Sequence, residues 1–213
     1  MSQLTLVHLV RHGEVFNPQK ILYGRLPGYH LSDRGVAMAD LVAEFFRNAD
    51  VTQLISSPME RAIQTAEPIG RIKNLAITQD QNLLEATNVF EGKRVAIGDG
   101  ALRSPKAWRH LWNPFRPSWG EPYQEIFTRM KAAVDAARIK AAGHEAVLVS
   151  HQLPIWIARL GYENRRFVHN PTHRECNLAS VTTLKFHDEK LVGITYQEPA
   201  AALYKESTGG VGA

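Results

Sequence analysis

The sequence predicts an α/β fold, a three-layer α/β/α sandwich with a mostly parallel mixed sheet. Short apolar runs typical of buried strands, such as residues 4–10 (LTLVHLV), alternate with longer segments whose apolar residues recur at helical spacing. Strands that alternate with helices are joined by crossover connections, which align the strands in parallel. Two runs near the end, 178–186 and 191–196, are close enough to form a hairpin, so we expect an antiparallel edge.

The first half of the chain begins with the strand over residues 4–10, which runs into the polar stretch Arg11-His12-Gly13-Glu14. A helix then begins at Ser32 or Asp33, because both residue types are good N-caps and apolar residues follow at helical spacing. By the same patterns we predict a strand over 51–55, a helix over 58–71 and a short strand over 76–79.

The second half opens with an irregular segment, 86–120, in which Gly, Pro, Trp and Arg are scattered without a period. A long helix follows over 121–142, with Pro122 in its first turn and Gly143 at its end. The remaining predicted elements are a strand over 146–149, a helix over 153–160 and the final hairpin, whose connector is 187–190.

The bulk properties indicate one globular domain. The chain has 213 residues, 44% of them apolar and 22% charged, and we assign residues 1–198 to a single domain and 199–213 to a flexible tail. A net charge of +4 suits an anionic ligand but falls short of a nucleic-acid-binding footprint. A single cysteine, Cys176, excludes an internal disulfide, and the sequence offers no signal peptide or membrane span. We therefore expect a cytoplasmic protein that does not bind membranes.

Polar, chemically capable side chains follow three of the predicted strands. His12 and His151 come directly after buried strands, and Arg61 lies near the start of the helix that follows a third. Ligands of open α/β sheets bind beyond the carboxyl ends of the strands, so we expect these residues and Arg11 to meet at one edge. Two arginines and two histidines would repel one another without an anion between them, and guanidinium groups match phosphate oxygens. The sequence therefore predicts a phosphate site.

Two of these residues have the chemistry for more than binding. A neutral imidazole is a competent nucleophile, so His12 could attack phosphorus, provided that its other ring nitrogen has a hydrogen-bond acceptor. We expect that acceptor to be a backbone carbonyl near Gly13. Glu85, placed to enter the same edge, would have a raised pKa beside a bound phosphate and could protonate the leaving alkoxide.

These residues resemble the histidine phosphatase superfamily, also called phosphoglycerate-mutase-like, in its phosphatase branch. The resemblance covers about residues 4–197 and rests on four blocks in order: Arg11-His12-Gly13-Glu14, Ser56-Ser57-Pro58 leading to Arg61 and Thr65-Ala66, Glu85, and Ser150-His151. It implies the fold predicted above, with His12 as the phosphorylated nucleophile and Glu85 as the proton donor. It also implies that Arg11, Arg61 and His151 bind the phosphoryl group.

Two segments are further candidates for substrate contact. In the loop after His12 these are Asn17, Tyr23, Gly24 and Arg25, although the same residues could simply hold the loop together. Many family members carry the corresponding asparagine slightly further from the histidine than Asn17. After Glu85, residues 87–92 are shorter than the usual family element. Residues 93–119 are basic and rich in tryptophan, and they could cap the site or form an ordinary packed loop.

A metal site is the weaker reading of His169 and His173. Their four-residue spacing suits metal binding on a helix, but Pro171 lies between them and argues against a helix. The sequence therefore predicts neither a metal nor a cofactor.

Three functions remain open at this point. The first is metal-independent hydrolysis of phosphomonoesters, with a small phosphorylated metabolite as substrate. The second is a phosphoglycerate-type mutase with the same chemistry, and the third is a non-catalytic module that binds phosphorylated ligands. We favour hydrolysis, because the extra sequence that closes over a bisphosphate in the mutases is not recognisable here.

Overall fold

The computed structural model describes residues 3–88, 91–93 and 120–206. One six-stranded sheet runs through it, in the order β3-β2-β4-β1-β5-β6. Its strands are β1 (Leu4–Arg11), β2 (Val51–Ser56), β3 (Thr78–Gln79), β4 (Glu145–Ser150), β5 (Val181–His187) and β6 (Lys190–Gln197). β1 to β4 pair in parallel, whereas β5 and β6 run antiparallel to their neighbours. The predicted mixed sheet with its antiparallel edge is confirmed.

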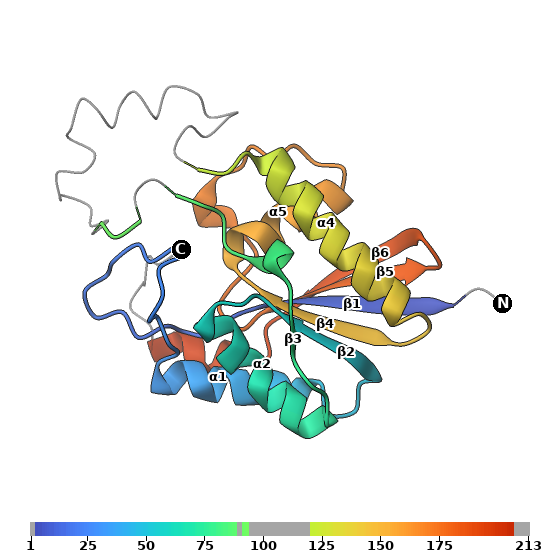
Figure 1. Ribbon diagram of the computed structural model, residues 1–213, viewed down its shortest axis with the longest axis horizontal. Helices are drawn as coiled ribbons and strands as arrows, with labels where there is room; N and C mark the ends of the chain where they lie inside the picture. Colours follow the sequence, from blue (N-terminus) through green and yellow to red (C-terminus); the bar gives the residue numbers. More distant parts are fainter. Residues whose placement is uncertain (1–2, 89–90, 94–119, 207–213) are drawn as a thin grey trace.

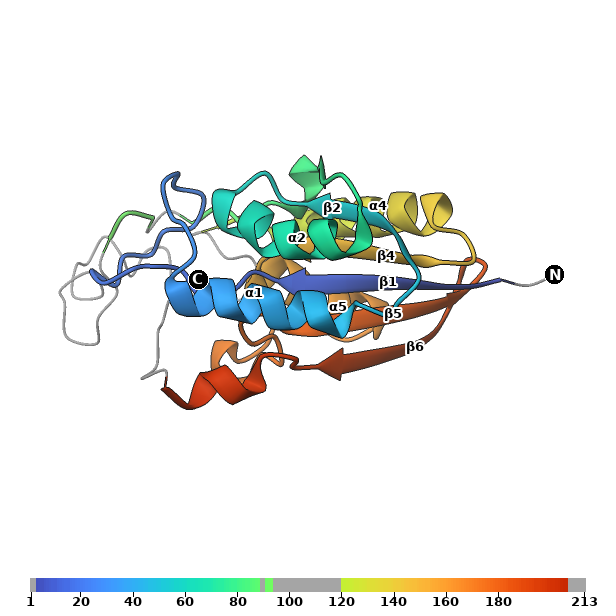
Figure 2. The same ribbon diagram turned by 90° about the horizontal axis from the view of Figure 1, so that it is seen from below.

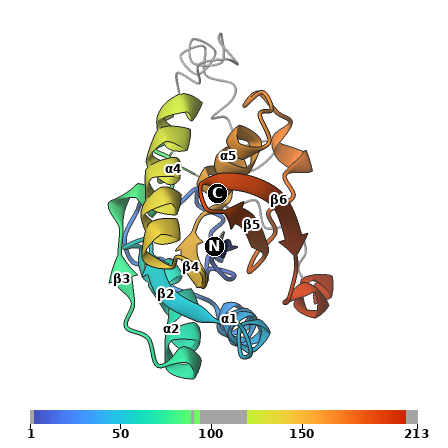
Figure 3. The same ribbon diagram turned by 90° about the vertical axis from the view of Figure 1, so that its right-hand side faces the viewer.

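Within the described residues, four helices cover the two faces of the sheet and make it the middle of three layers. They are α1 (Asp33–Phe45), α2 (Glu60–Lys73), α4 (Tyr123–Lys140) and α5 (Gln152–Tyr162). Seen end-on, α1 and α2 lie on one face, and α4 and α5 on the other (Figures 1 and 3). Short 3-10 helices span Gln81–Leu83, Pro171–His173 and Ala201–Glu206.

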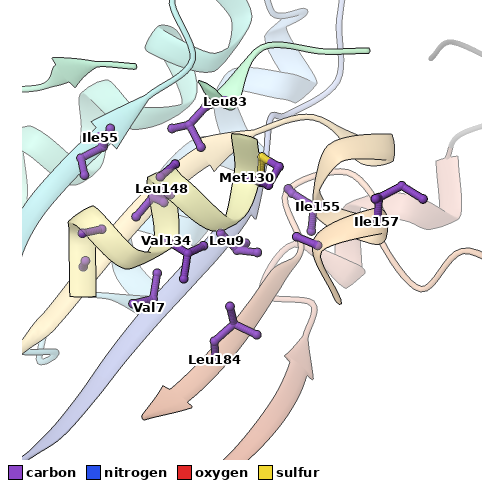
Figure 4. Packing of buried hydrophobic residues seen from close by; sticks show 14 of the residues in the cluster. Val7, Leu9, Ile55, Leu83, Met130, Val134, Leu148, Ile155, Ile157 and Leu184 are labelled. Carbon is purple, nitrogen blue, oxygen red and sulfur yellow. The ribbon is translucent and has the colours of Figure 1, made fainter. Parts of the chain in front are cut away.

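β1 alternates its side chains between two apolar cores. Val7 and Leu9 pack beneath α4 and α5, together with Leu148 of β4 (Figure 4). Val10 points to the opposite face and packs under α1 and α2, the pair that lies against the sheet in Figure 2. Both faces of the central strands are therefore buried, which explains why their sequences are nearly continuous apolar runs.

Local chemistry sets several element ends that differ from the sequence expectation. Of the two proposed caps of α1, Ser32 is the N-cap, since its hydroxyl accepts a hydrogen bond from the Gly35 N–H. Pro122 does not lie in the first turn of α4: its extended backbone (ψ 135°) makes it the N-cap, and the helix begins at Tyr123. β5 begins at Val181 rather than at 178, because Ala179 adopts a left-handed conformation (φ 54°).

The beginning of the predicted flexible tail is packed. Residues 201–206 form a 3-10 helix, and the Tyr204 hydroxyl donates a hydrogen bond to the Leu178 carbonyl. Leu203 and Tyr204 also contact the core under α1 and α2, which explains why this part of the tail is ordered. Residues 207–213 lie outside the described residues. No helix in the described part of the chain is long and apolar enough to cross a membrane, and the cytoplasmic location stays a prediction.

Candidate active site

The carboxyl end of β1 is held in place by its neighbours on both sides. The His12 N–H donates to the Ser150 carbonyl at the end of β4, and the Gly13 N–H donates to Oγ1 of Thr65 in α2. Gly13 passes so close to the start of α1 that a Cβ added there would lie 2.5 Å from the Gly35 carbonyl oxygen. Only glycine permits this approach, which turns the chain just after His12.

His12 is fully buried and has one ring nitrogen available. Its Nδ1 lies 2.8 Å from the Gly13 carbonyl oxygen, to which it donates, as the sequence predicted. The tautomer therefore leaves a lone pair on Nε2, which has no hydrogen-bond partner among the described residues. Burial, and then the charges of Arg61 and Arg11, hold the pKa of His12 well below its usual value. The ring is consequently neutral at physiological pH.

Arg61 is a fully buried cation with no carboxylate partner in the described chain. Its Nη2 donates to the Gly24 carbonyl at 2.7 Å and lies 3.3 Å from Nδ1 of His151, while Nε and Nη1 have no partner there. Burial lowers the pKa of Arg61, which shows that its charge is held at a cost. We therefore expect this guanidinium group to bind an anionic ligand.

Arg11, at the end of β1, repeats this arrangement. Its Nη1 donates to the Cys176 carbonyl at 2.7 Å, and its Nε is buried without a partner among the described residues. A phosphate between Arg11 and Arg61 would satisfy both guanidinium groups.

His151 completes the group at the end of β4. Its ring centroid lies 5.2 Å from that of His12, and its Nε2 is 2.8 Å from the Ser57 hydroxyl. Because Arg61 can only donate, Nδ1 of His151 must accept, and Nε2 then carries the proton. Burial, followed by the charge of Arg61, keeps the pKa of His151 well below its usual value.

Glu85 contributes the buried carboxyl group at this edge of the sheet. Its Oε1 accepts a hydrogen bond of 2.8 Å from the Ala86 N–H, whereas Oε2 has no partner in the described structure. Burial raises the pKa of Glu85, and this outweighs the lowering by the Ala86 hydrogen bond and by Arg61 and Arg11. A carboxyl group in this setting retains its proton to higher pH than an exposed one.

Two arginines that both bind Glu121 also donate hydrogen bonds to the backbone around Glu85. The sequence did not predict this arrangement. Arg25 donates to the Glu85 carbonyl at 2.6 Å and to Glu121 at 3.1 Å. Arg129 of α4 donates to Glu121 at 2.7 Å and to the carbonyls of Asn82 and Leu84. The contacts join residues separated by up to 96 positions, so no local pattern could have signalled them.

The loop candidates divide into two groups. Tyr23 is buried, and the guanidinium carbon of Arg61 lies 4.8 Å from its ring centroid; the neighbouring Gly24 accepts from the same arginine. Arg25 is engaged by Glu85 and Glu121, and both amide atoms of Asn17 bond to the backbone of Ile21. The structure thus brings Tyr23 and Gly24 to Arg61, and it shows no contact of Asn17 with the residues at the sheet edge.

The two remaining sequence hypotheses have different outcomes. The proposed cap over 93–119 lies outside the described residues, except for Lys93. His169 uses both ring nitrogens: Nδ1 donates to the Phe167 carbonyl and Nε2 accepts from Arg174. Within the described chain, no group of three or more His, Cys, Asp or Glu side chains could hold a metal ion, and His169 and His173 are no exception.

Comparisons with known proteins place this arrangement in a family. Uncharacterized protein Rv0525 of Mycobacterium tuberculosis is 53% identical over 94% of this chain and 100% of its own length. The probable phosphoglycerate mutase GpmB of Yersinia pestis is 32% identical over 70% of each chain. Among solved structures, the mycobacterial glucosyl-3-phosphoglycerate phosphatase Rv2419c superimposes with a TM-score of 0.72 over 92% of this chain and 98% of its own, at 21% identity.

The model of the histidine phosphatase superfamily (branch 1) matches residues 7–198, which include every residue of the sheet edge described above. The expected resemblance and the expected phosphoglycerate-mutase-like fold are therefore confirmed. This chain therefore belongs to the histidine phosphatase superfamily.

Proposed function

We propose that this protein hydrolyses phosphomonoesters through a phosphohistidine on His12. The observation that carries the proposal concerns a neutral, fully buried His12 whose Nε2 has no partner among the described residues. It is set beside two arginines that have no carboxylate partner in the same part of the chain. A nucleophile needs a free lone pair, and a transferring phosphoryl group needs fixed positive charge around its oxygens.

In the first step, Nε2 of His12 attacks phosphorus, and the bond from phosphorus to the ester oxygen breaks. Arg11, Arg61 and His151 hold the phosphoryl oxygens. Glu85 gives its proton to the leaving alkoxide, which departs as an alcohol. The Gly13 carbonyl keeps the proton of His12 on Nδ1, so that the attacking nitrogen is the unprotonated one.

In the second step, the ionised Glu85 accepts a proton from water while the water oxygen attacks phosphorus. The P–N bond breaks, inorganic phosphate forms, and Glu85 regains its proton. The raised pKa of Glu85 supports this double role, because the group can be an acid in one step and a base in the next. The positive charge comes from arginines, so the proposed reaction requires no metal.

A mutase is the second candidate, and one specific observation favours it: the GpmB relative of Yersinia is described as a probable phosphoglycerate mutase. A mutase would return the phosphoryl group from His12 to the substrate instead of to water. Release of phosphate without a bisphosphate primer supports the hydrolase, and primer-dependent isomerisation supports the mutase. A binding module that performs no chemistry would bind phosphate esters and leave them intact.

The experiment is a phosphate-release screen over small phosphorylated metabolites, with a chelator present, comparing the native protein with His12→Ala. We expect release that ignores the chelator and is absent in the variant. Release that persists in His12→Ala, or that stops when divalent ions are removed, would overturn the proposal.

A further inference from the structure

Arg174 shares an unusual property with the two arginines of the proposed phosphate site. Eight described arginines lie within ion-pair distance of a carboxylate: Arg25, Arg34, Arg47, Arg71, Arg129, Arg138, Arg159 and Arg165. The described arginines without such a pair are Arg11, Arg61, Arg174 and Arg166. Arg166 is exposed to water, whereas Arg174 is half-buried. Arg174 is therefore a partly desolvated cation with no described carboxylate within ion-pair distance.

Two neutral acceptors fix the orientation of Arg174. Its Nε donates to Nε2 of His169 at 2.8 Å, and its Nη1 lies 3.3 Å from Oε1 of Gln152. His169 can accept because its Nδ1 donates to the Phe167 carbonyl at 2.6 Å. These contacts orient the guanidinium group without cancelling its charge, and none of them uses Nη2.

The same contacts place Arg174 beside the proposed phosphate site. Gln152 directly follows His151, and its amide Nε2 donates to the Cys176 carbonyl at 3.3 Å. That carbonyl also accepts from Nη1 of Arg11 at 2.7 Å. Arg11 and Arg174 are thus joined through neutral groups, Gln152 and the Cys176 carbonyl. Arg174 is also close enough to Glu85 for each charge to shift the pKa of the other group.

We propose that Arg174 determines substrate specificity by binding a second oxyanion, carboxylate or phosphate, on the ester whose phosphoryl group lies at His12. A single phosphate would satisfy Arg11 and Arg61 and would leave the Arg174 charge uncompensated. A substrate with a second anionic group would neutralise it, and the unused Nη2 supplies a donor for that group. The proposal rests on the proposed function for the place of the phosphoryl group, and it adds the chemical class of the substrate.

A binding experiment tests Arg174 separately from turnover. Affinities are measured by calorimetry on the His12→Ala protein, in which the ligands stay intact. One pair of ligands, 3-phosphoglycerate and glycerol 3-phosphate, differs by a carboxylate. A second pair, 1,3-propanediol bisphosphate and propyl phosphate, differs by a phosphate. We expect the ligand with the second anionic group to bind about tenfold more tightly than its counterpart in at least one pair, as for one charge-assisted hydrogen bond.

Adding Arg174→Gln should abolish that preference, and Arg174→Lys should keep part of it. Arg166→Gln removes an equal charge from an exposed site and should leave the preference unchanged. Thermal unfolding of each variant verifies that it is folded. A preference that survives in Arg174→Gln, or equal affinities within both ligand pairs, would overturn the proposal. The ligand pair that responds identifies the second group as carboxylate or phosphate.

The same ligands are then tested as substrates of proteins that retain His12. This measurement distinguishes a failure of the inference about Arg174 from a failure of the proposed function. We expect Arg174→Gln to raise KM about tenfold for the substrate with the second anionic group and to change kcat/KM for its counterpart much less. An indirect effect through Glu85 would lower turnover of both substrates equally, and that result would contradict a specificity role. An Arg174-dependent binding preference in a protein that releases no phosphate would uphold the inference and refute the proposed hydrolysis.

Discussion

Two buried histidines, one in the middle of β1 and one just beyond its end, have opposite surroundings. His8, in the middle of β1, uses both ring nitrogens: Nε2 lies 2.8 Å from Glu145 and Nδ1 lies 2.8 Å from the Thr183 hydroxyl. His12, just beyond the end of β1, has a partner for Nδ1 and none in the described structure for Nε2. Both side chains are almost completely withdrawn from water.

The comparison extends to the groups around each histidine. The His8 ring lies against the Glu145 carboxylate, and its hydrogen bond holds the pKa of Glu145 low. Around His12, three residues from distant parts of the chain carry buried polar atoms without partners in the described structure. These atoms are Nε of Arg11, Nε and Nη1 of Arg61, and Oε2 of Glu85. Buried polar groups are normally satisfied, so we expect the contacts of His8 to stabilise the fold and the residues around His12 to bind a ligand.

The largest expected effect is on activity, at His12. His12→Ala should lower phosphate release at least about 10⁴-fold, since removal of a catalytic nucleophile abolishes the covalent route. Its thermal stability should change little, because in the described structure the ring has a single hydrogen-bond partner, the Gly13 carbonyl. Steady-state phosphate release and a thermal unfolding curve measure the two effects. Near-native activity in a folded variant would remove His12 from the chemistry.

The next effect is on the proton donor. Glu85→Gln should slow esters with poor leaving groups by about 10²- to 10³-fold, the range of general acid catalysis. Nitrophenyl phosphate should be slowed less, because its leaving group needs no proton. The ratio of kcat/KM for the two substrates is the readout. Equal losses on both would show that Glu85 does not protonate the leaving group.

The corresponding change at His8 should affect stability instead of activity. His8→Ala leaves Glu145 and Thr183 without their buried partner and should cost about 2–3 kcal/mol of unfolding free energy. The kcat of the folded variant should stay within about twofold of native, since His8 has no contact with the sheet edge. Denaturant unfolding and kcat at a permissive temperature test this. A large fall in kcat without a loss of stability would contradict the assignment of His8 to stability and of His12 to activity.

A phosphate ion should stabilise the protein against unfolding by binding to the polar groups around His12 that have no partner in the described structure. Inorganic phosphate or vanadate at about 100 times its dissociation constant should raise the unfolding free energy by about 2.7 kcal/mol. The shift should disappear in Arg61→Gln and persist in Arg166→Gln, which removes an exposed charge. Thermal unfolding with and without the anion provides the measurement. An equal shift in both variants would mean that the anion binds elsewhere.

The smallest expected effect is on the pH dependence of kcat/KM. Its acidic and alkaline limbs should each be displaced from the pH at which an ordinary histidine and an ordinary carboxyl group titrate. His12 must be neutral to attack, and its lowered pKa keeps activity down to a pH below the usual histidine range. Glu85 must be protonated as the acid, so activity should fall as the pH rises through its raised pKa. Glu85→Gln should lose the alkaline limb and keep the acidic one. Retention of both limbs would assign the alkaline limb to another group.

The sequence was a good guide wherever local chemistry sets the structure. The apolar runs before His12 and His151 predicted two parallel central strands, and the strand-end rule brought their histidines to one edge. Even the acceptor for Nδ1 of His12 could be predicted, because it belongs to the adjacent residue.

Contacts between distant segments could not be predicted. Glu121, Arg129 and Arg174 lie 36 or more positions after Glu85 in the chain, and nothing in their local sequence distinguishes them from surface charges. Their roles depend on hydrogen bonds to segments that are distant in the chain. The sequence offers Arg25 as a substrate contact or as a residue that holds its loop together, and in the structure it donates to the Glu85 carbonyl and to Glu121. Neither partner is a sequence neighbour of Arg25.

The most direct test of the central claim is to trap the intermediate. Native protein mixed with a ³²P-labelled ester that it hydrolyses is quenched in alkali within milliseconds, and the labelled peptide is mapped. The account predicts a phosphoryl group that is stable in alkali, labile in acid and attached to Nε2 of His12, with no label in His12→Ala. A label on any other residue, an acid-stable phosphoester, or turnover without a labelled protein would contradict it.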